Sequence, residues 1–164
     1  MKKDETFFEY PNFTNVKDII YYSVDKYREN RAFIIKEKVG EEVKYKNISY
    51  GDFLEEVNSL GTGLFRLGLK GKRIGIIAKN RYEWVLSYVA CLLGGMIAVP
   101  LDKGLTDLEI ENSILRSKID AIIFEDKLLG IIEEIRAKGN SNLKEYISMD
   151  KNKEFKSIED IKIS

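Results

Sequence analysis

The polar residues best placed for ligand binding each follow a short apolar run that is predicted to be a strand. Lys79, Asn80 and Arg81 come directly after one such run, and Asp102 comes shortly after the next. Open α/β sheets bind their ligands beyond the carboxyl ends of the strands. We therefore predict Lys79, Asn80, Arg81 and Asp102 as candidate ligand-binding residues. A competing interpretation, which we favour for Asn80, is that it only caps the following helix, because asparagine is a leading N-cap residue.

The chain contains no histidine and a single cysteine, Cys91. The lack of histidine removes every Ser-His-Asp or Cys-His arrangement and the commonest transition-metal ligand. One cysteine can form neither an intrachain disulfide nor a cysteine-rich metal site. Cys91 lies in an apolar helical stretch, so we interpret it as a small core residue rather than a nucleophile. We predict no catalytic residue and no metal site in this chain.

Two glycine-containing segments look like phosphate-binding loops but do not meet their requirements. Gly61-Thr62-Gly63 begins like a dinucleotide fingerprint, but Arg66 stands where the third small residue belongs, and the segment lies inside a predicted helix. Gly71-Lys72 is followed by Arg73 rather than serine or threonine, so it fails as a nucleotide-binding loop. We interpret the first segment as a site of close helix packing and the second as a turn with solvated bases.

The composition describes a globular chain without electrostatic preference for polyanions. The 164 residues are 44% hydrophobic and 33% charged, with 27 Lys and Arg balanced by 27 Asp and Glu. A net charge of zero argues against nucleic acid as a partner. No apolar stretch approaches the roughly 20 residues of a membrane span, and the N-terminus has no signal-peptide core. The single cysteine fits a cytoplasmic location.

The hydrophobic pattern predicts alternating helices and strands after an initial hairpin. Apolar residues at helical spacing indicate helices, and short apolar runs indicate strands covered on both faces. The expected strands are residues 31–36, 42–48, 73–78, 96–100, 121–124 and 146–149, and the expected helices lie between and before them. This alternation requires right-handed crossovers. We therefore predict an α/β fold with a mostly parallel, doubly wound sheet, helices on both faces and an N-terminal antiparallel hairpin.

Local signals place the ends of these elements and divide the chain. Ser49 with Asp52 and Thr106 with Glu109 are predicted helix N-caps. Residues 1–14 are expected to form an extended arm, residues 15–150 an α/β subdomain, and residues 151–164 a charged tail. The chain is thus divided into three regions, of which residues 15–150 are expected to be the compact one.

Three segments together resemble the adenylate-forming (AMP-binding) superfamily, which includes acyl-CoA synthetases, luciferases and the adenylation domains of peptide synthetases. Residues 48–69 (ISYGDFLEEVNSLGTGLFRLGL) resemble its first conserved stretch, and residues 73–106 resemble the second. Residues 117–126 (SKIDAIIFED) are similar to the stretch that follows. The run from Asn80 to Trp84 looks most like the long-chain fatty-acyl-CoA synthetase branch. The resemblance covers residues 15–149, almost the whole chain.

The resemblance implies a two-step reaction for a longer parent enzyme. A fatty acid carboxylate attacks ATP to give an acyl-adenylate and pyrophosphate, and the CoA thiol then displaces AMP. ATP, magnesium and CoA are thus implied for the parent, and fatty acid is its implied substrate. Members also carry a Ser/Thr/Gly-rich loop ending in lysine, which this sequence lacks, so no family catalytic residue can be carried over. We expect a fragment that binds no cofactor, is inactive alone, and leads through residues 151–164 toward missing ATP-binding segments.

Two other interpretations stay open. The chain could be a standalone, non-catalytic α/β binding or interaction module, or an unrelated α/β enzyme that uses the loops after Ala78 and Pro100. The reading frame beyond Ser164 distinguishes the ligase from the module. We expect the remaining subdomains of the parent to be the partners, and self-association through the apolar surface they would cover. For a cytoplasmic protein of this kind, peripheral contact with a membrane also stays open.

Overall fold

The computed structural model describes residues 11–40 and 42–163, so residues 1–10 of the predicted N-terminal arm lie outside the described part. Five strands form the central sheet, and they span Arg73–Ile77 (β3), Ile97–Pro100 (β4), Ala121–Phe124 (β5), Glu145–Ser148 (β6) and Lys156–Ser157 (β7). All neighbouring pairs are parallel, in the order β4-β3-β5-β6-β7. The first strand of the sheet in sequence, β3, therefore lies inside it, between β4 and β5. Parallel strands need a crossover between them, which the helices supply.

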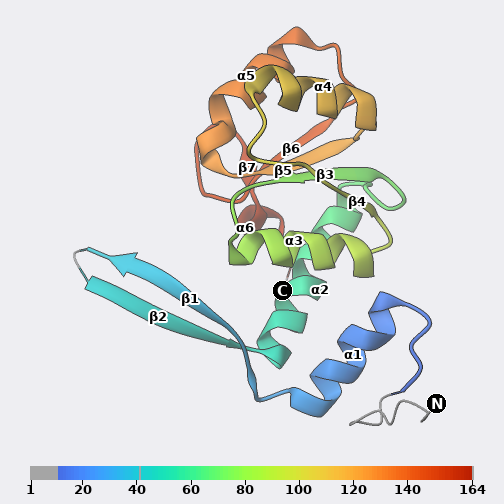
Figure 1. Cartoon of the computed structure of the whole chain (residues 1–164), viewed down its shortest axis with the longest axis vertical. Helices are drawn as coiled ribbons and strands as arrows, with labels where there is room; N and C mark the ends of the chain where they lie inside the picture. The colour runs from blue at the N-terminus through green and yellow to red at the C-terminus, as the bar shows by residue number, and fades with distance from the viewer. Residues whose placement is uncertain (1–10, 41, 164) are drawn as a thin grey trace, which may run out of the picture.

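Helices cover both faces of this sheet (Figure 1). On one face lie α2 (Tyr50–Arg66), α3 (Tyr82–Leu93) and α6 (Ile158–Ile161), and on the other α4 (Asp107–Ser117) and α5 (Leu129–Lys138), which follows the short 3₁₀ turn η1 (Asp126–Leu128). Side chains alternate along β5 between the two sides. Ala121 and Ile123 belong to the core shared with α2 and α3, whereas Ile122 and Phe124 belong to the core shared with α4 and α5. The predicted α/β fold with helices on both faces is confirmed.

The two predicted capping boxes are also confirmed. Ser49 Oγ accepts a hydrogen bond from the backbone N–H of Asp52, whose carboxylate accepts one from Ser49 N–H at 3.2 Å. Thr106 and Glu109 form the same reciprocal pair at the start of α4. Each pair satisfies two backbone N–H groups that the first helical turn leaves without partners.

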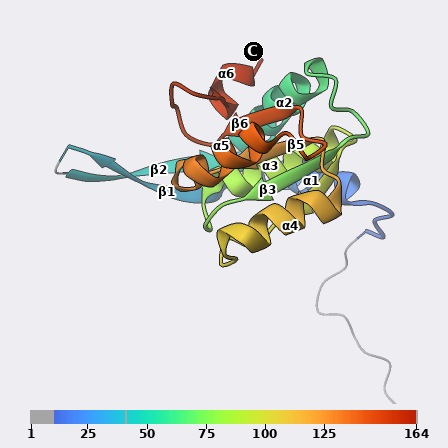
Figure 2. The same cartoon turned by 90° about the horizontal axis from the view of Figure 1, so that it is seen from above.

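The predicted hairpin consists of β1 (Arg31–Val39) and β2 (Glu42–Ser49), paired antiparallel. It projects from the body as a two-stranded ribbon (Figures 1 and 2). Its base is anchored by Phe33, whose ring centroid lies 5.0 Å from that of Phe53 and 5.3 Å from that of Tyr82. Further out, Ile34 and Tyr45 are 53% and 66% exposed. Helix α1 (Val16–Tyr27) precedes the hairpin and packs beside α2, with Asn15 as its N-cap.

Two elements differ from the sequence-based expectation. The run at residues 96–100 was expected to be covered on both faces, but β4 is the outermost strand of the sheet, with β3 as its one neighbouring strand. Ile97 in this edge strand is half exposed. Residues 151–164 were expected as a tail, whereas β7 and α6 lie within this segment and join the folded unit. Phe155, Ile158 and Ile161 are buried there.

The segment with α6, residues 158–163, explains the Gly61-Thr62-Gly63 sequence inside α2. A Cβ atom on Gly63 would overlap the backbone carbonyl of Ile161, so only glycine allows α6 to approach this closely. The contact is extended by a hydrogen bond from Ile163 N–H to Ser59 Oγ, at 3.0 Å, and by an ion pair between Lys162 and Glu56. The structure therefore agrees with close helix packing rather than phosphate binding. No helix in the described part of the chain is long and apolar enough to cross a bilayer.

Candidate functional site

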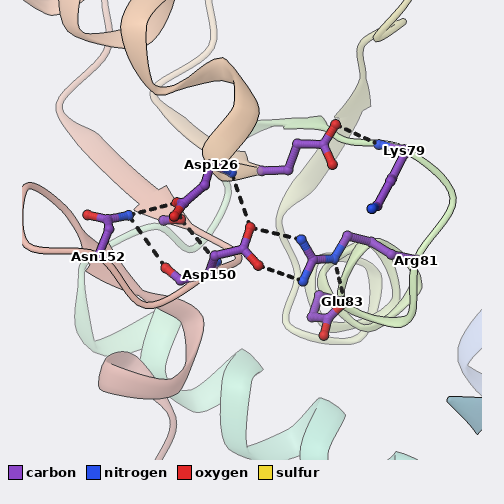
Figure 3. Close-up of polar contacts among 8 residues, drawn as sticks. Lys79, Arg81, Glu83, Asp126, Asp150 and Asn152 are labelled. Carbon is purple, nitrogen blue, oxygen red and sulfur yellow. Dashed lines mark hydrogen bonds and ion pairs between the residues drawn. The ribbon is translucent and has the colours of Figure 1, made fainter. Parts of the chain in front are cut away.

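The carboxyl ends of β3, β5 and β6 converge on one polar cluster (Figure 3). Residues 79–83 arrive from β3, Glu125 and Asp126 from β5, and residues 148–152 from β6. The strands are parallel neighbours in the order β3-β5-β6, so their ends lie along one edge of the sheet. This is the edge where α/β sheets bind ligands.

Arg81 is the centre of the cluster. Its Nη1 and Nη2 donate to the two carboxylate oxygens of Asp150 at 2.8 and 2.9 Å, and its Nε donates to Glu83 Oε2 at 2.6 Å. Burial opposes the charge of this guanidinium, but hydrogen bonds to Asp150 and Glu83 outweigh that effect and raise the pKa of Arg81. Two parallel hydrogen bonds to one carboxylate fix the orientation of the guanidinium and also pair the two charges. Three of the five N–H donors of Arg81 are therefore already bound to carboxylates of this chain.

Asp150 connects Arg81 to the rest of the cluster. Its Oδ2 also accepts a hydrogen bond from the backbone N–H of Asp126 at 3.1 Å, and its own N–H donates to Ser148 Oγ at 3.0 Å. Burial disfavours the charged carboxylate, yet the hydrogen bonds from Arg81 and Asp126 prevail and lower the pKa of Asp150. Asp126 in turn accepts from Ser148 Oγ at 2.7 Å and from Asn152 Nδ2 at 2.9 Å. The loop after β6 is thus tied to both β5 and α3.

Lys79 and Asn80 lie beside this network with their side chains exposed. The backbone N–H of Lys79 donates to Glu125 Oε1 at 3.3 Å, but its ammonium forms no ion pair with a carboxylate in the described residues. Asn80 is not the helix cap: α3 begins after Arg81 as N-cap, with no side-chain capping bond. The interpretation of Asn80 as a helix cap is therefore wrong, and Asn80 is exposed to solvent.

Asp102 is separated from the other three candidates. It follows β4, and its Oδ1 accepts a hydrogen bond from Gly104 N–H at 2.8 Å, which closes its own turn. It does not line the hollow that the other three share. As the sequence predicted, the loop at residues 79–81 and the loop with Asp102 each follow a strand, β3 and β4. The edge position of β4 sends its loop away from the ends of β5 and β6.

A groove of about 570 Å³ lies between this cluster and the hairpin. One wall consists of four consecutive β1 residues, Phe33 to Lys36. The other wall consists of residues 79–83, Val85 and Asp150. Sequence reasoning predicted Lys79, Asn80 and Arg81 at this site but missed Asp150 in the groove wall and Glu125 and Asp126 in the adjoining cluster. The available signal was the same as for Lys79: these acidic residues directly follow the apolar runs at residues 121–124 and 146–149.

The groove does not fit a nucleotide phosphate chain or its magnesium ion. The connection from β3 to α3 contains no glycine, so its backbone amides are flanked by side chains, unlike those of a phosphate-binding loop. Its one arginine is held by two carboxylates. No group of three or more Asp, Glu, Cys or His side chains within residues 11–40 and 42–163 is arranged to hold a metal ion. Cys91 is buried in the core, where burial raises the pKa of its thiol to about 12.

Comparisons with known proteins match this fold and sequence to one group of enzymes. The AMP-binding enzyme family matches residues 21–162. The fatty acyl-CoA synthetase A of Dictyostelium discoideum is 32% identical over 87% of this chain, and the long-chain-fatty-acid–CoA ligase 5 of Rattus norvegicus is 37% identical over 65% of it. The chain spans only 22% and 16% of those relatives.

Solved structures show the same fold. The anthranilate CoA ligase AuaEII, in complex with anthranoyl-AMP, superposes with a TM-score of 0.75 at 23% identity over 93% of this chain and 27% of its own. The long-chain-fatty-acid-CoA ligase FadD1 of Archaeoglobus fulgidus gives a TM-score of 0.77 at 19% identity, over 94% of this chain and 30% of its own. With the family match extending from α1 to α6, the chain belongs to the AMP-binding enzyme family.

Proposed function

We propose that this chain is the amino-terminal subdomain of an acyl-CoA ligase that activates a long-chain fatty acid. The observation that carries the proposal is the 32% identity to a fatty acyl-CoA synthetase over 87% of this chain, within only 22% of that relative. The reaction would have two steps. A carboxylate oxygen attacks the α-phosphorus of ATP and releases pyrophosphate, and the CoA sulfur then attacks the acyl carbon and releases AMP. Magnesium would balance the phosphate charge in the first step.

The role of this chain within the ligase is that of a scaffold. Arg81, the strongest anion-binding group at the candidate site, already pairs with two carboxylates, Asp150 and Glu83, and their negative charges oppose the binding of a phosphate there. Beside Arg81, the groove would offer a nucleotide the exposed polar side chains of Lys36, Lys79 and Asn80, without the glycine-rich backbone of a phosphate-binding loop. We therefore propose that the chain alone forms no acyl-adenylate and binds neither ATP nor CoA. Its partners would be the remaining subdomains of the ligase, in a cytoplasmic protein that contacts membranes peripherally.

An ATP–pyrophosphate exchange assay tests this role. The 164-residue chain is incubated with ATP, magnesium, labelled pyrophosphate and fatty acids of eight to eighteen carbons, beside the Dictyostelium synthetase as a positive control. We expect no exchange above the protein-free background for this chain. Fatty-acid-dependent exchange would show that it contains an adenylation site.

The parent activity is tested separately. Sequencing past Ser164 and expressing the complete reading frame should give a protein that forms fatty acyl-CoA from ATP, CoA and a long-chain fatty acid. A frame that ends at Ser164, with no CoA thioester formed, would instead support the standalone binding module.

We also propose that the exposed apolar face of the hairpin drives self-association of the isolated chain. Ile34, Val43 and Tyr45 are all roughly half exposed or more, and β1–β2 pairing places them on the same face. In sedimentation velocity, the sedimentation coefficient should increase with protein concentration. Tyr45→Lys should abolish this increase, and Leu108→Lys, at an exposed residue of α4, should not. A concentration-independent monomer would contradict the proposal.

A further inference from the structure

Residues 149–163 lead from the end of β6 to α2 with little secondary structure of their own. They contain only the two-residue strand β7 and the four-residue helix α6. A helix this short is not stable by itself in water, and β7 pairs with β6 alone. The position of this segment therefore comes from the contacts that it makes with the rest of the chain.

Ion pairs hold the segment near both of its ends. At its start, Asp150 accepts two hydrogen bonds from Arg81, just before α3. Near its end, Lys162 donates a hydrogen bond to Glu56 of α2 at 2.7 Å. The side chains of Arg81 and Lys162 are 19% and 15% exposed, less than any other cation in an ion pair of the described residues. Partly buried pairs are screened less than exposed ones, so these two are the firmest charged contacts of the chain.

Hydrogen bonds continue from the first ion pair toward α6. Asn152 Nδ2 donates to Asp126 Oδ1 at 2.9 Å, and Asn152 Oδ1 accepts from the backbone N–H of Phe155 at 2.8 Å. Helix α6 then begins with a capping box of its own. The path from Asp150 to α6 thus contains no loop without such contacts, and a displacement of Asp150 would be transmitted to α6.

The end of this path determines where the main chain passes α2. The backbone N–H of Ile163 donates to Ser59 Oγ at 3.0 Å. In the ligase proposed above, ATP is bound by segments outside this chain, and the segments that follow are joined to it beyond Ile163. A misplacement of about 1 Å in the groups that position a substrate can lower a rate about 100-fold. The placement of residues 149–163 is therefore a property on which the reaction of the ligase would depend.

We propose that Arg81 is a positioning residue of the ligase, which holds residues 149–163 on α2 through Asp150 and so fixes the position from which the ATP-binding segments follow. This role rests on the proposed function. Arg81 touches neither ATP nor fatty acid, and its effect on the reaction passes through Asp150. The planar guanidinium is required because its two parallel hydrogen bonds fix direction as well as distance, which a lysine ammonium does not do.

Amide hydrogen exchange tests the structural part of the proposal on the 164-residue chain. Arg81→Lys keeps the charge but loses the two parallel bonds. We expect the amides of residues 150–163 to exchange at least about fivefold faster in this variant, and those of α4 to change less than about twofold. Arg28→Lys, at the exposed ion pair with Glu55, is the matched control and should change neither region. Unchanged exchange of residues 150–163 in Arg81→Lys would overturn the proposal.

Kinetics of the complete ligase test the positioning role. Arg81→Lys should lower kcat per folded molecule at least about tenfold, with a smaller change in KM for ATP. A direct contact with ATP would chiefly raise KM, and a loss of stability alone would change neither value per folded molecule. Asp150→Asn should cause a similar loss, and the double variant should lose no more than the worse single variant, because both act through one contact. An unchanged kcat, or losses that multiply in the double variant, would contradict the role.

The two experiments separate this inference from the proposed function. A complete ligase that is inactive without any substitution would overturn the proposed function, and with it the positioning role of Arg81. Unchanged amide exchange, or an active ligase whose kcat is insensitive to Arg81→Lys, would overturn the inference and leave the proposed function intact.

Discussion

Arg81 and Lys79 stand two residues apart in one loop, yet the structure uses them differently. The planar guanidinium of Arg81 matches the two oxygens of Asp150 and leaves a third donor for Glu83, which a lysine ammonium could not reproduce. Lys79 contributes its backbone N–H to Glu125 and keeps its ammonium in solvent. Residue type and position predicted a ligand-binding role for both. The contacts assign Arg81 to holding the loop after β6, and leave the Lys79 ammonium without a direct ion pair in the described residues.

The lowered pKa of Asp150 predicts a specific acid sensitivity at this residue. A carboxylate whose pKa is lower in the folded state stabilises the fold above its unfolded pKa, near 4, and loses that contribution as pH falls through the folded value. Asp150→Asn should therefore cost about 1–2 kcal/mol at pH 7, allowing for partial exposure, and progressively less toward pH 2. Urea unfolding followed by circular dichroism across this range measures the difference.

Asp102→Asn is the matched control for that experiment. Asp102 bonds only Gly104 within its own turn, and asparagine retains an oxygen for that bond. It should change stability by less than about 0.5 kcal/mol at either pH. Stability curves for Asp150→Asn and the unmodified chain that stay parallel from pH 7 to pH 2 would contradict the assigned role of Asp150.

At the scale of elements, α2 packs against two neighbours through two glycines with different constraints. Gly61 faces α3, where an added Cβ would meet the backbone oxygen of Ala90 at 3.5 Å, an ordinary contact. Gly63 faces α6, where the same atom would overlap the backbone of Ile161. Both glycines lie in the last two turns of a 17-residue helix, at helical positions where glycine is unfavourable relative to alanine. Only Gly63 is therefore required by the packing, and it allows residues 158–161 to close the α2 side of the molecule.

Alanine substitutions separate these two glycines. Gly63→Ala should destabilise the chain by about 1–3 kcal/mol, because α6 must shift away from α2. Gly61→Ala should be neutral or stabilise by up to about 1 kcal/mol through improved helix propensity. Denaturant midpoints of the two variants provide the measurement. A Gly63→Ala variant as stable as Gly61→Ala would show that α6 does not lie against α2 in solution.

At the scale of the whole molecule, one five-stranded sheet separates two apolar cores. Leu60 is fully buried in the core on the α2 and α3 side, and Ile132 is fully buried in the core on the α4 and α5 side. The strands contribute alternate residues to both, so neither core can form without the sheet. We therefore infer that the two sides unfold together, as one cooperative unit.

The only tryptophan, Trp84, reports on that cooperativity because it packs on the α2 and α3 side. Leu60→Ala and Ile132→Ala should each destabilise the chain by about 2–5 kcal/mol. Both should lower the midpoint of the Trp84 fluorescence transition, and fluorescence should coincide with circular dichroism. If Ile132→Ala shifted the circular dichroism signal and left the Trp84 transition in place, the two cores would be independent units.

Features that depend on neighbours in sequence were predictable from the sequence. Capping boxes join residues three positions apart, as at Ser49 and Asp52, and strands and helices follow from the spacing of apolar residues. The alternation of those elements determined the α/β class, since parallel strands need helical crossovers. The candidate loop at residues 79–81 followed from the same logic, because ligand edges lie at strand ends.

Only the tertiary structure decided which strand ends meet. The order β4-β3-β5-β6-β7 places Asp150 against Arg81, 69 residues away, and leaves Asp102 alone beyond the edge strand. It also brings α6 onto Gly63 and makes a folded element of a segment that reads as a charged tail. The physical reason is that apolar spacing within a segment reports that a face is buried. Which other segment buries it depends on contacts between distant residues, which local patterns do not specify.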